Sequence, residues 1–130
     1  MNALARDFSL QLREGDVVWI DGPLGAGKTH FVKALALALG FTGTVSSPTF
    51  PLLHEYRWDG RVLYHLDFYR LESLEEIYRA GLEDYLPGDG IALVEWASRF
   101  PEVIKNARWK VEIKLFGNEN REVTIESFDS

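Results

Sequence analysis

The sequence predicts an α/β fold of three layers, with a mostly parallel central sheet and added antiparallel hairpin strands. Three observations predict it. A glycine-rich segment, residues 22–29, connects a predicted strand to a predicted helix. Segments with strand and helix patterns then follow one another, which is typical of a sheet with helices packed on its faces. Residues 51–68 and 109–128 each resemble two strands joined by a turn, which indicates hairpins.

The individual elements follow from local patterns. Residues 16–20 are mostly apolar and β-branched, as in a buried parallel strand, and residues 31–39 are expected to form a helix that Gly40 ends. The weakly patterned residues 4–12 fit either a short helix or an edge strand. After this helix we expect two strands, at 51–56 and 61–68, joined by an Asp59-Gly60 turn. A helix capped by Ser73 is expected to begin at Leu74 and end near Gly81, with a further turn over 82–86. The remaining elements are expected to be a strand at 91–95, a connector at 101–106 with one helical turn, and strands at 109–116 and 122–128.

The composition is that of a globular domain. The chain has 130 residues, of which 46% are hydrophobic and 26% charged, and it has no cysteine. This length predicts one domain over residues 1–130, and the lack of cysteine excludes disulfides, thiolate metal sites and cysteine nucleophiles. The longest apolar stretch, residues 34–39, is too short to span a bilayer, and no signal peptide is visible. We therefore expect a cytoplasmic protein.

The charge balance argues against direct binding of nucleic acid. The formal net charge is −6, and the basic residues are dispersed along the chain. Contacts with nucleic-acid phosphates require clustered Lys and Arg side chains. We expect any role in RNA metabolism to run through a protein partner.

Residues 22–29 match the phosphate-binding loop, or Walker A pattern, G-x-x-x-x-G-K-[ST]. The glycines let main-chain N–H groups close around a polyphosphate, and the helix that follows favours an anion at its N-terminus. Lys28 would reach the β and γ phosphates, and the Thr29 hydroxyl would ligate Mg²⁺. The pattern predicts a nucleotide-binding domain of the P-loop NTPase type. The alternative is a glycine-rich strand-to-helix turn with an incidental lysine.

Residues 91–95 have the form of a Walker B strand, in which apolar residues end in an acid. The acid, Glu95, would reach the Mg²⁺ shell beside the phosphate-binding loop. The pattern is weak alone, because apolar runs ending in Glu are common, but it gains weight beside the Walker A segment. Trp96 follows directly, and the sequence leaves open whether it lies in the core or covers the site.

Asp67 is a second candidate acid. It lies near the end of an apolar strand, where α/β folds place their ligands and where an unpaired carboxylate is costly. A functional role is favoured over a structural ion pair with a residue such as Arg70. His65 shares a strand face with Asp67, but we interpret it as a satisfied core histidine and leave it out of the catalytic set.

The segment at residues 41–50 is rich in Ser and Thr and follows the phosphate-loop helix. In P-loop NTPases a loop at this place can carry a hydroxyl that senses the γ-phosphate and Mg²⁺. The segment is equally compatible with an ordinary connector that uses Ser and Thr for turn hydrogen bonds. The pattern alone leaves both interpretations open.

Four segments together resemble the TsaE (YjeE) family, small bacterial P-loop ATPases needed for threonylcarbamoyladenosine modification of tRNA. They are residues 22–29, Ser-Pro-Thr-Phe at 47–50, His-Leu-Asp-Phe-Tyr-Arg-Leu at 65–71 and Leu-Val-Glu-Trp at 93–96. The resemblance extends from about Gly15 to the terminal hairpin. Family members usually carry a longer, threonine-containing stretch ahead of the first strand than this sequence does.

The resemblance implies a role for each matching residue. It makes residues 47–49 a switch loop and Asp67 the acid that positions or deprotonates the attacking water. The residues it implies in nucleotide binding are Gly22, Leu24, Gly25, Ala26, Gly27, Lys28, Thr29, His30, Thr49 and Arg121. Those implied in catalysis are Asp67, Lys28 and Glu95, and those implied in binding Mg²⁺ are Thr29 and Glu95.

The resemblance also implies partners and a reaction. The family works with TsaD and TsaB, which transfer threonylcarbamoyl to tRNA. On this resemblance the chain hydrolyses ATP to reset their complex and contacts tRNA only indirectly.

Three rival functions are a small P-loop kinase, a GTPase and an ATP-sensing interaction module without essential hydrolysis. No acceptor pocket or arginine-bearing lid is visible for a kinase, and no N-K-x-D or D-x-x-G follows the loop as in GTPases.

Overall fold

The structure is a computed structural model that describes residues 2–23, 27–41, 53–86, 89–104, 107–116 and 120–128. These residues form α1 (Asn2–Ser9), β1 (Val17–Asp21), α2 (Lys28–Ala38), β2 (Leu53–Trp58), β3 (Arg61–Asp67), α3 (Leu74–Arg79), β4 (Ile91–Glu95), β5 (Trp109–Phe116) and β6 (Asn120–Ser127). Three 3₁₀ turns are η1 (Leu82–Tyr85), η2 (Ala97–Arg99) and η3 (Pro101–Val103). No helix in this part of the chain is long and apolar enough to cross a membrane.

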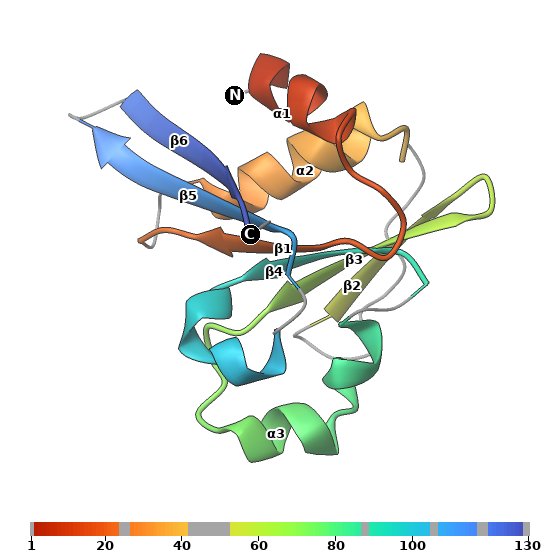
Figure 1. The fold of residues 1–130 in the computed structure, drawn as a ribbon, viewed down its shortest axis with the longest axis vertical. Helices are drawn as coiled ribbons and strands as arrows, with labels where there is room; N and C mark the ends of the chain where they lie inside the picture. The colour runs from red at the N-terminus through yellow and green to blue at the C-terminus, as the bar shows by residue number, and fades with distance from the viewer. Residues whose placement is uncertain are drawn as a thin grey trace.

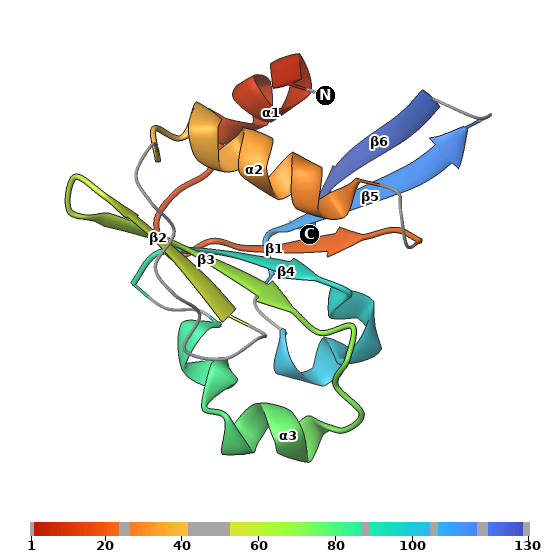
Figure 2. The same cartoon turned by 180° about the vertical axis from the view of Figure 1, so that it is seen from behind.

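The strands form one six-stranded sheet in the order β2-β3-β4-β1-β5-β6. Strands β3, β4, β1 and β5 run parallel to one another, and β2 and β6 add antiparallel strands at the two edges. Helices α1 and α2 cover one face of the sheet, while α3 and the 3₁₀ turns lie on the other (Figures 1 and 2). This three-layer arrangement confirms the predicted α/β fold.

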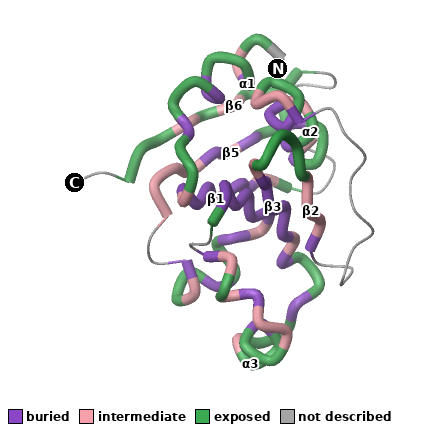
Figure 3. Tube along the Cα trace, turned by 90° about the vertical axis from the view of Figure 1, so that its right-hand side faces the viewer, coloured by how far each residue is buried: buried purple, intermediate pink, exposed green. Residues whose placement is uncertain are grey.

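A hydrophobic core lies on each face of the sheet. Figure 3 shows the central strands β1 and β3 buried and much of β6 exposed. The core under α1 and α2 includes Phe8, Ile20, Phe31, Leu35, Leu63 and Leu93. The core on the α3 side includes Leu66, Phe68, Ile77, Leu82, Val94 and Phe100. Because β3 and β4 contribute to both cores, their position is held from both sides.

Most predicted elements are present, with shifted ends. Helix α2 begins at Lys28 rather than Phe31, because Gly27 adopts a left-handed backbone (φ 99°) and its carbonyl accepts a hydrogen bond from the Phe31 N–H at 2.9 Å. Residues 2–9 form a helix, which decides between the two options left open by the sequence. The predicted hairpin turn is present, with Asp59 (φ 52°) and Gly60 (φ 76°) both left-handed.

The parallel strands bring three chain segments to the same edge of the sheet. Asp67 ends β3 and lies beside Glu95, the last residue of β4. Glu95 in turn lies beside Ile20 near the end of β1, directly before the phosphate-binding loop. The topology therefore places the two candidate acids and the start of that loop together, where parallel sheets bind their ligands.

We expect Gly90→Ala to lower the free energy of unfolding by about 1–3 kcal/mol, because a side chain at this position overpacks the core. A Cβ on Gly90 would lie 2.3 Å from the Val62 carbonyl oxygen and 2.5 Å from Val62 Cγ1. Denaturant unfolding measures the loss.

The matched control is Gly15→Ala. A Cβ there meets no atom within 4 Å, but the backbone is left-handed (φ +90°), so a smaller loss of about 1 kcal/mol is expected. Wild-type stability of the Gly90→Ala protein would contradict the tight packing of this turn against Val62.

Candidate functional site

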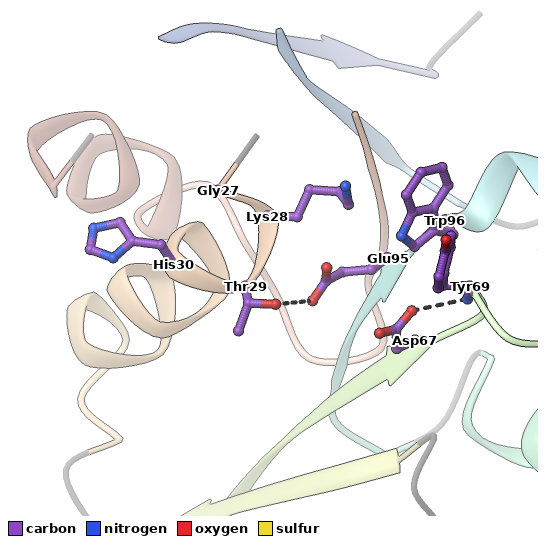
Figure 4. A pocket seen from close by; sticks show the side chains of 8 residues that line it. All are labelled: Gly27, Lys28, Thr29, His30, Asp67, Tyr69, Glu95 and Trp96. Carbon is purple, nitrogen blue, oxygen red and sulfur yellow. Dashed lines mark hydrogen bonds between the residues drawn. The ribbon is translucent and has the colours of Figure 1, made fainter. Parts of the chain in front are cut away.

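A cavity of about 330 Å³ opens at the carboxyl edge of the sheet, beside the N-terminus of α2. Its lining combines a cation, two acids, a hydroxyl and two aromatic rings. The residues that line it are Gly27, Lys28, Thr29, His30, Asp67, Tyr69, Glu95 and Trp96 (Figure 4). They come from the first turn of α2 and from the segments that end β3 and β4.

Lys28 supplies the positive charge of the site. Its ammonium group donates to the carbonyl oxygens of Gly22 at 2.6 Å and Pro23 at 2.8 Å. It also lies 4.2 Å from the centre of the Trp96 ring, a cation–π contact. Burial lowers the pKa of Lys28, although the negative charges of Glu95, Asp67 and Asp21 oppose that shift. The positive charge of Lys28 is thus held where the loop meets the cavity.

Glu95 is buried, with only 3% of its surface exposed. Its Oε2 atom accepts a hydrogen bond from the Thr29 hydroxyl at 3.0 Å and lies 2.5 Å from His65 Nε2. Burial alone would raise the pKa of Glu95. The hydrogen bonds from His65 and Thr29, with the charges of His65 and Lys28, outweigh burial and lower it. Glu95 is therefore an ionised acceptor at neutral pH, and we infer that the N–H that faces it from His65 is at Nε2.

Asp67 is half-buried at the end of β3 and lines the cavity. Its Oδ1 accepts a hydrogen bond from the Tyr69 N–H at 3.0 Å (Figure 4). This bond keeps the Asp67 carboxylate beside the backbone of the next loop. In the described residues, Asp67 therefore pairs with a backbone N–H and not with Arg70, the structural partner considered from the sequence.

Trp96 forms a wall of the cavity and also packs, half-buried, against the core on the α3 side. Its backbone is left-handed (φ 60°), which is uncommon for a bulky residue. Its N–H donates to the Ile20 carbonyl at 3.0 Å, and its ring packs against Tyr69 with centroids 5.0 Å apart. Two hydrogen bonds from Ser98 to Asp21 Oδ1 also hold this turn against the end of β1. These contacts turn the indole toward Lys28.

Comparison with known proteins places the chain in a family. The family model described as threonylcarbamoyl adenosine biosynthesis protein TsaE matches residues 1–123. The chain belongs to the TsaE family. The resemblance drawn from the four sequence segments is therefore confirmed.

Individual relatives support the same assignment. The chain is 42% identical over 123 residues to the tRNA threonylcarbamoyladenosine biosynthesis protein TsaE of Bacillus subtilis, covering 95% of this chain and 77% of that protein. It is 42% identical over 115 residues to the TsaE protein of Treponema pallidum, covering 88% and 84%. The crystal structure of YdiB from Bacillus subtilis superposes with a TM-score of 0.79 at 35% identity, covering 98% and 78%.

The site of this TsaE-family chain contains many of the residues expected from the sequence. Gly27, Lys28, Thr29, His30, Asp67 and Glu95 all line the cavity, and the Gly22 carbonyl binds Lys28. Arg121 lies in β6 opposite Leu115 and is not among the lining residues. Leu24, Gly25, Ala26 and Thr49 lie outside the described residues, as does the expected switch loop at residues 47–49.

The sequence pattern predicts a satisfied core histidine at position 65. It is buried, at 6% exposed, and its hydrogen-bond partner is Glu95 in the site. Side chains alternate between the two faces of a strand, so the sequence already places His65 on the same face of β3 as Asp67. This shared face is the sequence signal that His65 lies near the site. Its contact with Glu95 depends on how β3 and β4 pair, which the sequence pattern does not specify.

The ionisation of Glu95 makes stability depend on pH. Its folded pKa lies below the usual 4.5, so its charge stabilises the fold above that pH, and the contribution is lost as the pH falls through the folded pKa. We expect the stability of wild type relative to Glu95→Gln to decrease as the pH falls below about 4.5. Denaturant unfolding across this range measures the difference. A difference that does not change with pH would contradict the ionised state.

Proposed function

We propose that the chain binds ATP with Mg²⁺ in this cavity and hydrolyses the ATP. The observation that carries the proposal is the pairing of the Thr29 hydroxyl with the ionised Glu95 carboxylate, 3.0 Å apart beside Lys28. The relatives are named for tRNA threonylcarbamoyladenosine biosynthesis. We therefore propose that hydrolysis supports the TsaD and TsaB proteins in the threonylcarbamoyladenosine modification of tRNA. The chain would contact tRNA only through their complex.

The side chains present fit Mg²⁺ bound together with nucleotide phosphates. Mg²⁺ prefers oxygen ligands and is usually held by one or two protein groups plus phosphates. Thr29 and Glu95 offer a hydroxyl and an ionised carboxylate on adjacent elements, α2 and β4. When bound, Mg²⁺ would neutralise charge that develops on the phosphate oxygens.

The side chains around the cavity would bind the phosphates and activate the attacking water. Lys28 and the backbone of the phosphate-binding loop would hold the β and γ phosphates and stabilise negative charge in the transition state. Asp67 would orient a water molecule for in-line attack on the γ-phosphate or accept its proton. Trp96 and Tyr69 form the wall beside these groups and restrict access of solvent.

The proposed ATPase is slow alone and faster with its partners. No arginine is present among the described residues that line the cavity, so no side chain there supplies the second cation that accelerates many P-loop enzymes. We expect the TsaD–TsaB complex to raise the turnover number about tenfold or more. Phosphate release measured with and without that complex tests this. A full rate from the isolated chain would contradict it.

Asp67→Asn is expected to reduce ATP turnover about 100-fold or more, because the amide cannot accept a proton from water. ATP binding, measured by titration calorimetry, should be retained. The matched control is Asp59→Asn, the same change at the β2–β3 turn, where the left-handed backbone (φ 52°) suits Asn. This control should keep wild-type turnover.

The same variant separates hydrolysis from ATP sensing. Cells that carry Asp67→Asn should lose threonylcarbamoyladenosine if turnover is required. Full retention of the modified nucleoside in tRNA, despite lost hydrolysis, would favour an ATP-sensing module. Transfer of phosphate to a metabolite would instead favour a small P-loop kinase.

A further inference from the structure

The geometry points to His65 as a positioning residue that holds the Glu95 carboxylate toward Thr29 for Mg²⁺ binding. This inference rests on the proposed function and extends it by one residue. On this proposal His65 is not itself a ligand of the metal. Its action runs through the carboxylate of Glu95.

Two hydrogen bonds meet on one oxygen of Glu95. Oε2 lies 2.5 Å from His65 Nε2 and 3.0 Å from Thr29 Oγ1. The side chains of His65 and Glu95 are only 8% and 4% exposed, so water cannot readily replace the imidazole. A buried carboxylate needs such donors to remain ionised and in place.

The sheet makes His65 a rigid support. His65 lies within β3, between His54 of β2 and Leu93 of β4. Two positions further along both strands, Asp67 lies beside Glu95. The imidazole therefore reaches Glu95 diagonally across two paired strands. Groups that position a ligand from the strands of a sheet hold it more accurately than groups on loops.

His65 is also the donor that remains when the site is occupied. The proposed function requires Thr29 Oγ1 as a metal ligand, so that hydroxyl cannot serve Glu95 alone. The His65 Nε2–H has no such second task. Removing it would leave the carboxylate free to turn and would weaken the metal site without touching the phosphate-binding residues.

Loss of such an orienting partner typically reduces metal affinity by about 10- to 100-fold. We therefore expect His65→Leu to reduce, by about tenfold or more, the gain in ADP affinity that Mg²⁺ produces. ADP affinity in the presence of excess chelator should equal that of wild type. Titration calorimetry with ADP, with Mg²⁺ and with chelator, measures both quantities without relying on turnover.

Two further variants test whether the hydrogen bond is responsible. His65→Gln places an amide N–H near the Nε2 position and should restore most of the Mg²⁺ effect. His54→Leu removes the neighbouring imidazole, whose ring centroid is 5.8 Å from that of His65. This matched control should retain the full Mg²⁺ effect.

The outcomes separate this inference from the proposed function. A wild-type chain whose ADP affinity is unchanged by Mg²⁺ would overturn both. A normal Mg²⁺ effect in wild type and an equal one in His65→Leu would overturn only the role of His65. If His65→Leu does not fold, His65→Gln is compared with His65→Asn, whose amide is too short to reach Glu95. A Mg²⁺ effect kept by Gln and lost by Asn supports the inference, and equal effects overturn it.

Discussion

The hydrogen bond between the Thr29 hydroxyl and the Glu95 carboxylate joins the first turn of α2 to the end of β4. The acceptor is an ionised acid in a buried place, and the surrounding residues stabilise that state. His65 donates to the same oxygen, and the positive charge of Lys28 lies close enough to lower the pKa of Glu95. The cation, the hydroxyl and the acid thus form one electrostatic unit beside the cavity.

The fold supports this unit from three strands. Strands β1, β3 and β4 are parallel neighbours, so the phosphate-binding loop, Asp67 and Glu95 leave the sheet at one edge. Buried residues on both faces of β3 and β4 fix the depth of the two acids relative to α2. The Trp96 N–H donates a hydrogen bond to the Ile20 carbonyl, and the Ser98 hydroxyl donates one to Asp21. The position of the turn at Trp96 is therefore fixed by the end of β1. The site therefore depends on packing that begins well outside the cavity.

Local patterns were sufficient to predict the fold and most of the described residues that line the cavity. The glycine and lysine spacing of residues 22–29 is a local signal, and the apolar run ending in Glu95 is another. Parallel strands then bring their ends together whatever the details of packing. The role of His65 and the placement of Trp96 could not be predicted in this way. The first depends on the register between β3 and β4, and the second on a left-handed backbone that a tryptophan rarely adopts.

We propose above all that Thr29 and Glu95 bind Mg²⁺ while Lys28 binds the phosphates of a nucleotide. A crystal structure of the chain with Mg²⁺ and a non-hydrolysable ATP analogue tests it most directly. We expect the metal at Thr29 Oγ1 and the Glu95 carboxylate, with Lys28 Nζ moved from the Gly22 and Pro23 carbonyls to the phosphate oxygens. A nucleotide bound elsewhere, or a metal that touches neither Thr29 nor Glu95 directly or through water, would contradict it.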